Sequence, residues 1–590
     1  MEQRLVRVRQ LMKSAGYDAL IVPRADEYLG EYIPAHNERL QWISGFNGSA
    51  GVVVILQDTA AIFTDGRYTV AVRQEVSADS FQYHHLINEP HLPWLKNQLP
   101  EGSRVSYDPR LHSLVWQREA VRILGGGGLE LIADTDNLID RSWDDRPAAN
   151  IGKAILLGEQ YTGESSFDKR RRIAEAVAHI GADAALIFAP DSVSWLLNIR
   201  GTDIPCLPIV QSFAVLGVDG SVVLLVDPGR IPQGFADHVG EGVEVVAESS
   251  AQEIFQRYKG KTMLADPSAC NAWTQLLLAE CGATLISRED PVLLPKACKN
   301  SVEIEGTRAA HIRDAVAEVK FLAWLDSEVA KGNLYDESVL ADKLLSFRQL
   351  APEFKDSSFD TISATGANAA MCHYNFRNGL PGQMEMGSVY LVDSGAQYPD
   401  GTTDITRTIA IGDPGDDVRR MYTLVLKGHI ALAQARFPHG TTGTQLDVLA
   451  RQFLWREGFD YDHGTGHGVG SFLSVHEAPQ RISKASSTVA LCSGMIISNE
   501  PGYYREDGFG IRCENLVVVR DVKEEQTETA LLEFETITLV PFDNRLLVSE
   551  LLTPAEREWL NAYHDRVRDT LEPLLDGDDL KWLLAVTKAV

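Results

Sequence analysis

The first half of the chain repeats one pattern of apolar and polar positions. AGYDALIVP at 15–23 follows an amphipathic helical segment and places a glycine turn before an apolar strand. IGADAALIFAP at 180–190 again follows such a segment. Each strand leads into an aromatic and apolar stretch that ends in glycine, QWISGF at 41–46 and SWLLNIRG at 194–201. The repeat predicts two related α/β domains in the N-terminal half.

Proline and charged residues interrupt this pattern near 145–150 and near 293–306. We therefore predict three domains, at residues 1–150, 151–300 and 301–590. The third domain opens on EIEGTRAAHIRDAVAEVKFLAWLDSEVA, whose apolar residues recur every three or four positions and predict a long helix. Its length of about 290 residues suits one catalytic domain with a C-terminal extension.

The segment 387–412 predicts a hairpin with an acid on each strand. VYLV leads into Asp393, DITRTIAI begins at Asp404, and YPDGTT between them offers Pro-Asp-Gly turn chemistry. A hairpin would bring the two carboxylates side by side, where they repel unless they share a proton or bind a cation. Taken alone, the segment is explained more simply by two solvated aspartates beside a turn.

Two further acids lie on apolar strands. SGMIISNEPGYY at 493–504 runs a strand into Glu500, and FGIRCENLVVV at 509–519 places Glu514 inside a strand. An unpaired acid in an apolar strand is costly to bury, so four such acids together predict a cavity that holds divalent cations. Mostly oxygen ligands with one imidazole favour manganese or another hard to borderline metal. Two ions that share carboxylates would hold a hydroxide for hydrolysis.

The imidazole would come from YDHGTGHGVGSFLSVHE at 461–477, which contains three histidines among many glycines. Glycine at this density indicates that something approaches the backbone closely. The spacing alone leaves open which histidine binds metal. A single histidine in a glycine-rich loop is more often a turn or core residue than a ligand.

These motifs occur together in a known family. VDSGAQYPDGTTDITRT, HGTGHGVG, VHEAP, NEPGYY and GIRCEN, in this order, resemble the pita-bread metallopeptidases, which include methionine aminopeptidase, prolidase and aminopeptidase P. CHYNF at 372–376 fits the upstream histidine of that family. EYIPAHNERLQWISGFNGSAG, FTDGRY and the doubled N-terminal half are similar to the long, three-domain form of aminopeptidase P. The resemblance implies an α/β fold of two creatinase-N-like domains followed by a pita-bread catalytic domain.

The resemblance implies a ligand set for two divalent ions, with Mn²⁺ as the expected metal. Asp393 would bind one ion, and His467 and Glu500 would bind the other. Asp404 and Glu514 would bridge the two.

It also implies roles around the metals. Glu500 would be the general base, His373 and His476 would stabilise the transition state, and Arg512 would steady a ligand carboxylate. His463 would lie near the leaving residue. The implied substrate contacts are Arg67, His373, His463, His467, His476 and Glu500.

The activity implied is removal of the first residue from peptides whose second residue is proline. The X–Pro bond lacks an N–H and has a fixed φ, so proteases that bind extended strands handle it poorly. Two alternatives stay open: a prolidase that cleaves Xaa-Pro dipeptides, and a non-catalytic relative that binds peptides. The doubled N-terminal half favours aminopeptidase P, and methionine aminopeptidase usually lacks such domains.

Composition and charge argue against some classes of partner and indicate where the protein acts. The net charge of −27 argues against nucleic-acid binding, which needs a basic face. No apolar run approaches the roughly 18 residues that span a bilayer. The seven cysteines lack CxxC spacing and are typical of a reduced, intracellular protein. We therefore expect a cytoplasmic enzyme without nucleic-acid or membrane partners. The resemblance implies a homodimer through the catalytic domain.

Overall fold

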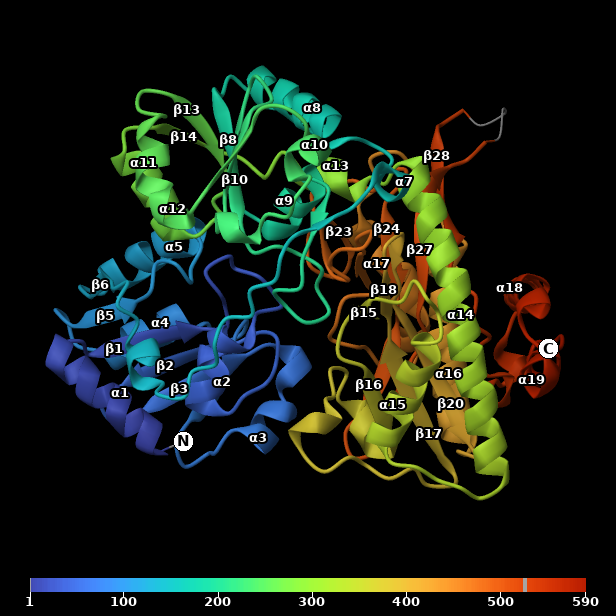
Figure 1. Ribbon diagram of the computed structural model, residues 1–590. Coiled ribbons are helices and arrows are strands. Elements are labelled where there is room, and N and C mark those ends of the chain that lie inside the picture. Colours follow the sequence, from blue (N-terminus) through green and yellow to red (C-terminus); the bar gives the residue numbers. More distant parts are fainter. Residues whose placement is uncertain (1, 524–527) are drawn as a thin grey trace. The chain divides into compact units, whose positions relative to one another are not determined.

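The computed structural model describes residues 2–523 and 528–590. The chain forms two compact units (Figure 1). The first comprises residues 1–159 and 164–293, and the second comprises residues 160–163 and 294–590. The first unit runs from blue to green in Figure 1, and most of the second runs from yellow-green to red.

The first unit contains two six-stranded sheets with the same strand order, β4-β3-β2-β1-β5-β6 and β12-β11-β10-β8-β13-β14. In each sheet, one inner strand pairs antiparallel with the strand of that sheet that follows it in the chain, and parallel with a later one. The predicted duplication of an α/β fold is therefore confirmed. The strands are β1 (Ala19–Pro23), β2 (Val52–Leu56), β3 (Ala60–Thr64), β4 (Gln82–His85), β5 (Arg104–Tyr107), β6 (Glu130–Ala133), β8 (Ala184–Ile187), β10 (Phe213–Gly217), β11 (Val222–Leu225), β12 (Val243–Val246), β13 (Thr262–Ala265) and β14 (Thr284–Ser287).

The two halves of this unit begin with the same helix, turn and strand. α1 (Glu2–Ala15) precedes β1, and α8 (Ser166–His179) precedes β8. Gly16 and Gly181 in the two turns have φ of 72° and 82°, a left-handed conformation that glycine adopts without strain. The sequence repeat is therefore a repeat of local structure.

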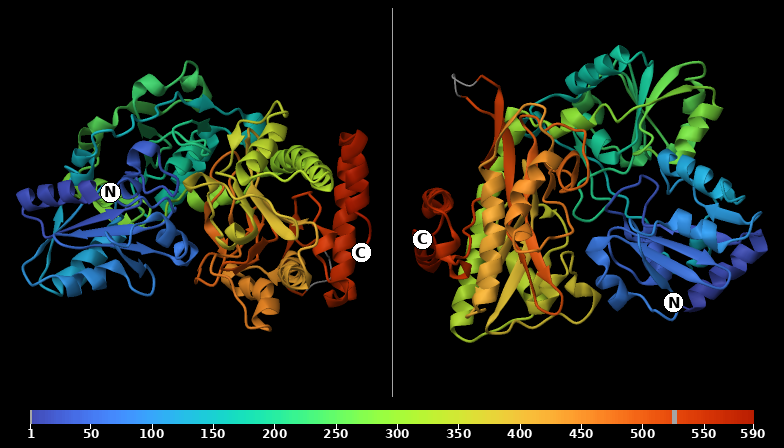
Figure 2. Two further views of the ribbon diagram at one scale, coloured as in Figure 1. Left: turned by 90° about the horizontal axis from the view of Figure 1, so that it is seen from below. Right: turned by 180° about the vertical axis from the view of Figure 1, so that it is seen from behind.

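The second unit is built around a six-stranded sheet, β21-β28-β27-β24-β22-β23, and a three-stranded sheet, β16-β17-β20. Both lie beside long helices (Figure 2). The strands are β16 (Ile362–Thr365), β17 (Ser388–Ser394), β20 (Ile405–Ile411), β21 (Arg436–Pro438), β22 (Gly466–Gly468), β23 (Glu477–Ile482), β24 (Ile496–Asn499), β27 (Asn515–Asp521) and β28 (Leu531–Thr536). The helices are α14 (Ser301–Ala330), α15 (Glu337–Arg348), α16 (Asp416–Ala433), α17 (Gly443–Trp455), α18 (Pro554–Leu571) and α19 (Gly577–Val586).

The predicted long helix is α14. Asn300 caps its N-terminus and forms a capping box with Glu303, which satisfies amide groups that would otherwise lack partners. Phe321 and Leu322 of α14 share one hydrophobic core with Tyr390 of β17 and Tyr422 of α16. The same core includes residues of α18 and α19, so the C-terminal helices pack onto the rest of the second unit (Figure 2).

The predicted hairpin between the two aspartates is present. β17 and β20 pair antiparallel, and Asp393 lies opposite Thr406. Between them β18 (Ala396–Tyr398) and β19 (Gly401–Thr402) pair across a short turn. Asp404 directly precedes β20, so both carboxylates lie at the same end of the β17–β20 pair.

The placement of Glu514 inside a strand is wrong. Cys513 and Glu514 lie between β26 (Phe509–Arg512) and β27. β26 pairs with β25 (Gly502–Arg505), whereas β27 pairs with β24. The chain changes strand partners at this point, and Glu514 therefore occupies a break between two sheets.

Every helix of the described ranges is too short or too polar to cross a membrane.

Candidate active site

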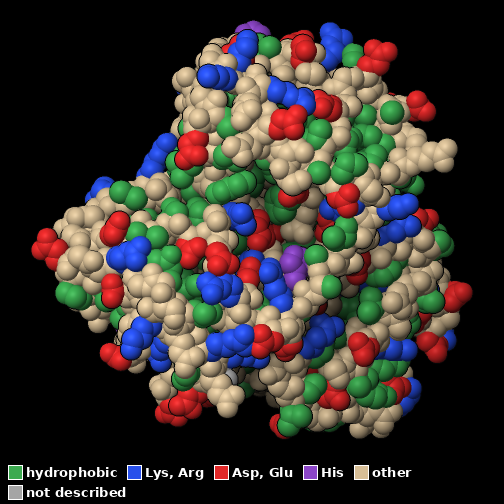
Figure 3. All heavy atoms as spheres, turned by 60° about the vertical axis from the view of Figure 1, so that its left-hand side comes forward, with side chains coloured by type: hydrophobic (Ala, Val, Ile, Leu, Met, Phe, Trp, Pro, Cys, Tyr) green, Lys and Arg blue, Asp and Glu red, His purple; other side chains and the backbone are tan. Residues whose placement is uncertain are grey.

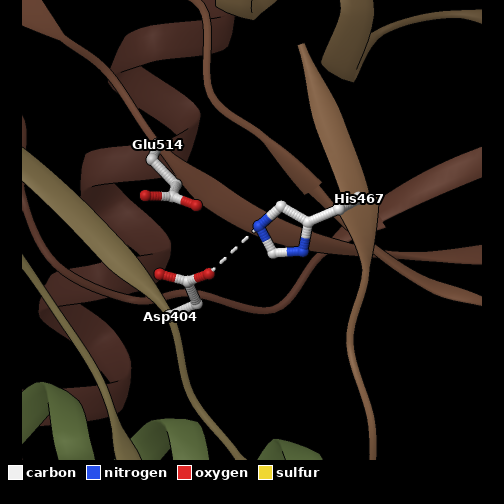
Figure 4. Close-up of side chains that lie close together, drawn as sticks. All are labelled: Asp404, His467 and Glu514. Carbon is white, nitrogen blue, oxygen red and sulfur yellow. Dashed lines mark ion pairs between the residues drawn. The ribbon is translucent and has the colours of Figure 1, made fainter. Parts of the chain in front are cut away.

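Three of the predicted ligands converge at one point in the second unit. Asp404, His467 and Glu514 each offer a donor atom within 4.8 Å of the others. Figure 4 shows their side chains pointing toward one another from separate parts of the fold. Both acids are buried, and His467 is partly exposed. The arrangement can hold a cation that all three residues contact.

His467 faces the acids through one defined nitrogen. Its Nε2 lies 3.4 Å from Asp404 Oδ2 and 3.4 Å from Glu500 Oε1. Its Nδ1 lies 3.0 Å from the carbonyl oxygen of Gly468, which favours a proton on Nδ1 and leaves Nε2 free to bind a metal.

The glycines beside His467 let neighbouring chain approach closely. A Cβ on Gly466 would lie 1.9 Å from the carbonyl oxygen of Ser498. A Cβ on Gly468 would lie 2.4 Å from the carbonyl oxygen of Glu477. Side chains at these positions would push β22 away from β24 and β23 and displace the imidazole. The predicted need for glycine is therefore explained by packing between strands.

Asp393 carries an unsatisfied oxygen. Its Oδ2 accepts a hydrogen bond from Arg512 Nη2, whereas its buried Oδ1 has no hydrogen-bond partner among the described residues. Burial raises the pKa of Asp393 to about 6, and the nearby carboxylates of Asp404 and Glu500 add to this rise against the opposing effect of Arg512. A buried carboxylate oxygen without a partner is costly, and a cation would satisfy it.

The pKa values of Glu500 and Glu514 are raised as well. Burial raises the pKa of Glu500, and burial together with the neighbouring acids raises the pKa of Glu514 well above its usual value. Burial opposes charge on His467, yet Asp404 and Glu500 raise its pKa to about 9. Burial and the neighbouring acids together therefore disfavour the charged form of these carboxylates. The donor set therefore fits divalent cations.

Arg512 connects four groups around the acids, as its predicted role requires. It binds Asp393, and its Nε donates to Thr406 Oγ1 at 3.0 Å. Thr406 in turn donates to Glu514 Oε2 at 2.6 Å. The Nη1 of Arg512 donates to the Tyr504 hydroxyl at 2.8 Å and to the Cys372 carbonyl at 3.3 Å.

Two further predicted histidines border the acids. The rings of His476 and His467 have centroids 4.3 Å apart. His463 Nδ1 lies 3.8 Å from Glu500 Oε2, and its Nε2 lies 2.8 Å from the Tyr504 hydroxyl.

His373 and Arg67 are placed less directly. His373 is partly buried and follows Cys372, whose carbonyl group contacts Arg512. Arg67 belongs to the first unit, where its Nη2 lies 2.7 Å from Asp65 Oδ2. Its predicted contact with a peptide therefore stays a prediction.

Sequence reasoning missed a buried ion cluster beside His476. Glu477 accepts hydrogen bonds from Lys299 and, at 3.2 Å, from Lys296, and all three side chains are about 1% exposed. The lysines lie in the segment interpreted as a domain boundary, where charge indicates solvent exposure. Nothing in the sequence around the two lysines indicates that their partner lies 181 and 178 residues away. Tyr504, in contrast, could have been found as part of the NEPGYY motif.

Comparisons with known proteins agree along the whole chain. Residues 305–521 match metallopeptidase family M24, and residues 530–590 match the C-terminal region of that family. Residues 4–141 and 145–303 each match the creatinase/prolidase N-terminal domain.

Individual relatives match over similar lengths. The chain is 39% identical to a Tuber melanosporum protein named "Probable Xaa-Pro aminopeptidase P", over 100% of this chain and 99% of the relative. It is 36% identical to aminopeptidase P1 of Arabidopsis thaliana, over 100% and 99% of the two chains.

Among solved structures, X-prolyl aminopeptidase from Caenorhabditis elegans matches with a TM-score of 0.95 and 32% identity, over 100% of this chain and 99% of that one. That protein is described as a cytosolic enzyme with a di-nuclear active site. Xaa-Pro dipeptidase from Bacillus anthracis has a TM-score of 0.51 and 23% identity over 64% of this chain and 99% of its own, which shows a shared fold.

The convergence of acids leads to a prediction about metal content. Glu514→Gln removes one charge but keeps a side chain of the same shape. We expect metal analysis of the purified variant, equilibrated with Mn²⁺, to give one ion or fewer per chain where the wild type gives two, because Glu514 would contact both ions.

Asp400→Asn is the control, because Asp400 is an acid in the turn between β18 and β19 and pairs with Arg313. Equal metal content in Glu514→Gln and the wild type would show that Glu514 is not a ligand.

Proposed function

Since the chain belongs to metallopeptidase family M24, we propose that it is a metal-dependent Xaa-Pro aminopeptidase, which releases the first residue of peptides that have proline second. The full-length match to aminopeptidases P supports this function over that of a prolidase. The observation that carries it is the convergence of Asp404, His467 and Glu514, whose donor atoms lie within 4.8 Å of one another.

Two divalent ions fit this cavity. We assign Asp393 to one ion, His467 and Glu500 to the other, and Asp404 and Glu514 to both. Manganese is the proposed metal, because four carboxylates and one imidazole suit a hard to borderline ion. When bound, the ions would lower the pKa of a water between them and supply hydroxide near neutral pH.

The chain's own side chains would then move the proton. Glu500 accepts a hydrogen bond from Ser498 Oγ on Oε1 at 3.0 Å, which leaves Oε2 facing His463. We assign Oε2 as the atom that takes the proton from the attacking water and passes it toward the proline nitrogen. His463 would lie beside that leaving group.

Two histidines would stabilise the charge that develops on the scissile carbonyl oxygen. The ring of His476 packs edge-on against His467, which places it beside the ligand set. His373 would approach from the segment held by Arg512. Donors placed at a developing oxyanion stabilise the transition state more than the bound substrate. We further propose that Arg67 contacts the peptide.

The proposed assembly is a homodimer through the catalytic domain. Val448 and Trp455 lie seven residues apart on α17, so they share one face, and they are 43% and 44% exposed. Large apolar side chains on one exposed helix face are typical of a contact surface.

We propose a cytoplasmic location without nucleic-acid partners. The cytosolic description of the Caenorhabditis elegans relative and seven free cysteines support the location. The net charge of −27 disfavours nucleic-acid binding. Basic and acidic side chains are interspersed over the face drawn in Figure 3.

The proposed role of Glu500 predicts the effect of Glu500→Gln. The variant keeps an oxygen that can bind metal but cannot accept the proton, so we expect kcat on an Xaa-Pro-Pro tripeptide to fall by about 10²- to 10⁴-fold. Steady-state kinetics with parallel metal analysis measure this.

The matched control is Glu506→Gln, because Glu506 is an exposed acid a few residues along the same chain segment. A folded, metal-loaded Glu500→Gln protein that cleaves at the wild-type rate would refute the assignment.

The choice between aminopeptidase P and prolidase predicts a substrate preference. We expect the Mn²⁺-loaded protein to cleave an Xaa-Pro-Pro tripeptide and a longer Xaa-Pro peptide with higher kcat/KM than the dipeptide Gly-Pro. Chromatographic detection of the released first residue measures this. Preference for Gly-Pro would instead establish a prolidase.

A further inference from the structure

The segment that carries His373 has little regular structure of its own. Between β16 and β17 it forms two short 3-10 helices, η5 (Gly366–Ala370) and η6 (Phe376–Asn378). A side chain that stabilises a transition state must be held to within about 0.5 Å. The segment therefore needs anchors from outside itself.

The buried carboxylate of Glu337 supplies most of these anchors. Glu337, the first residue of α15, is fully buried. Its Oε1 accepts hydrogen bonds from the Thr365 amide at 2.8 Å, the Thr365 hydroxyl at 3.1 Å and Asn368 Nδ2 at 2.9 Å. Its Oε2 accepts from the Tyr374 hydroxyl at 2.8 Å and the Gly382 amide at 2.6 Å. Glu337 therefore binds the start, the middle and the end of the segment.

The contact at Gly382 runs in both directions. The amide of Glu337 donates to the Gly382 carbonyl at 3.0 Å, while the Gly382 amide donates to the Glu337 carboxylate. A Cβ on Gly382 would lie 2.8 Å from Glu337 Oε1 and 2.6 Å from Asn368 Nδ2. Glycine at this position is what lets the chain close over the carboxylate.

These contacts bracket His373. Tyr374, which follows it, donates to Glu337 and accepts from Asn368 Nδ2 at 3.0 Å. Cys372, which precedes it, accepts from Arg512, the residue that also holds Asp393. The residues on both sides of the histidine are thus fixed by partners outside the 371–375 stretch.

The donors to Glu337 are neutral groups, and they use both oxygens of the carboxylate. Burying an acid without a direct cation is costly, and hydrogen bonds to the charged form offset that cost. The helix does not require a buried acid at its first position. The preceding cap residue, Asp336, already accepts hydrogen bonds from the amides of Ser338 at 2.9 Å and Val339 at 3.1 Å. The hydrogen bonds that Glu337 accepts from the 365–382 segment explain why an acid lies at this position.

We propose that Glu337 is a positioning residue, which holds His373 at the active site through the Tyr374 hydroxyl and the Gly382 amide. The proposal rests on the proposed function, because it acts through the role assigned to His373. Glu337 belongs neither to the proposed metal ligands nor to the proposed substrate contacts, and its carboxylate bonds to residues 365–382.

A double-mutant cycle tests this. Glu337→Gln turns one acceptor into a donor that faces other donors, and Tyr374→Phe removes one hydroxyl. In the wild-type background we expect kcat on an Xaa-Pro-Pro tripeptide to fall about 10- to 100-fold for Glu337→Gln and several-fold for Tyr374→Phe, with KM changed less than about threefold. In a His373→Ala background the same changes should cost less than about threefold, because the group they position is gone.

The matched control is Asp336→Ala, which removes side-chain hydrogen bonds to Ser338 and Val339 at the start of the same helix. It should lower the melting temperature and leave kcat within about twofold of wild type. Metal content should be unchanged in every variant.

Three results would overturn the inference: equal losses in both backgrounds, an equal loss of kcat in Asp336→Ala, or full activity of His373→Ala. If Glu337→Gln does not fold, Tyr374→Phe alone decides by the same comparison. The activity of the wild-type protein distinguishes failure of this proposal from failure of the proposed function. If the wild type cleaves no Xaa-Pro peptide, the proposed function itself is wrong.

Discussion

The constraint on which the catalytic unit depends is the placement of four carboxylates, three buried and one half-buried, around one imidazole. Asp393, Asp404, Glu500 and Glu514 come from four separate chain segments, and burial raises the pKa of three of them. Negatively charged carboxylates that lie close together in a low-dielectric protein interior repel one another strongly. Protons or cations must compensate them, and a hydrolase that works near neutral pH gains most from cations, which can also activate water.

Buried arginines show how the fold holds these acids. Arg512 binds Asp393 and reaches Glu514 through Thr406. Arg407, on the strand that follows Asp404, donates to the Glu514 carbonyl and, at 3.1 Å, to the Pro541 carbonyl. The C-terminal chain is therefore tied to the backbone of a proposed ligand. The surrounding hydrogen bonds fix where the acids point, and the metals would supply the missing charge.

Periodicity and turn chemistry predicted much of this fold: the duplicated α/β half, helix α14 and the β17–β20 hairpin. The expected ligand set came from the family resemblance of the motifs, and its assignment to two ions stays a prediction. Glu514 was misplaced because a single apolar run spans two strands that pair with different partners. Glu337 and Lys299 were not predicted, because their partners lie 28 to 45 and 178 residues away, and local patterns of charge suggest solvent. The peptide contact expected of Arg67 stays a prediction.

Anomalous diffraction at the manganese absorption edge, from crystals grown with Mn²⁺, tests the central claim most directly. The account predicts two anomalous peaks, one bound by Asp393 and the other by His467 and Glu500, with Asp404 and Glu514 contacting both. A single peak, or peaks bound by other residues, would contradict the assignment of these five side chains to a dinuclear site.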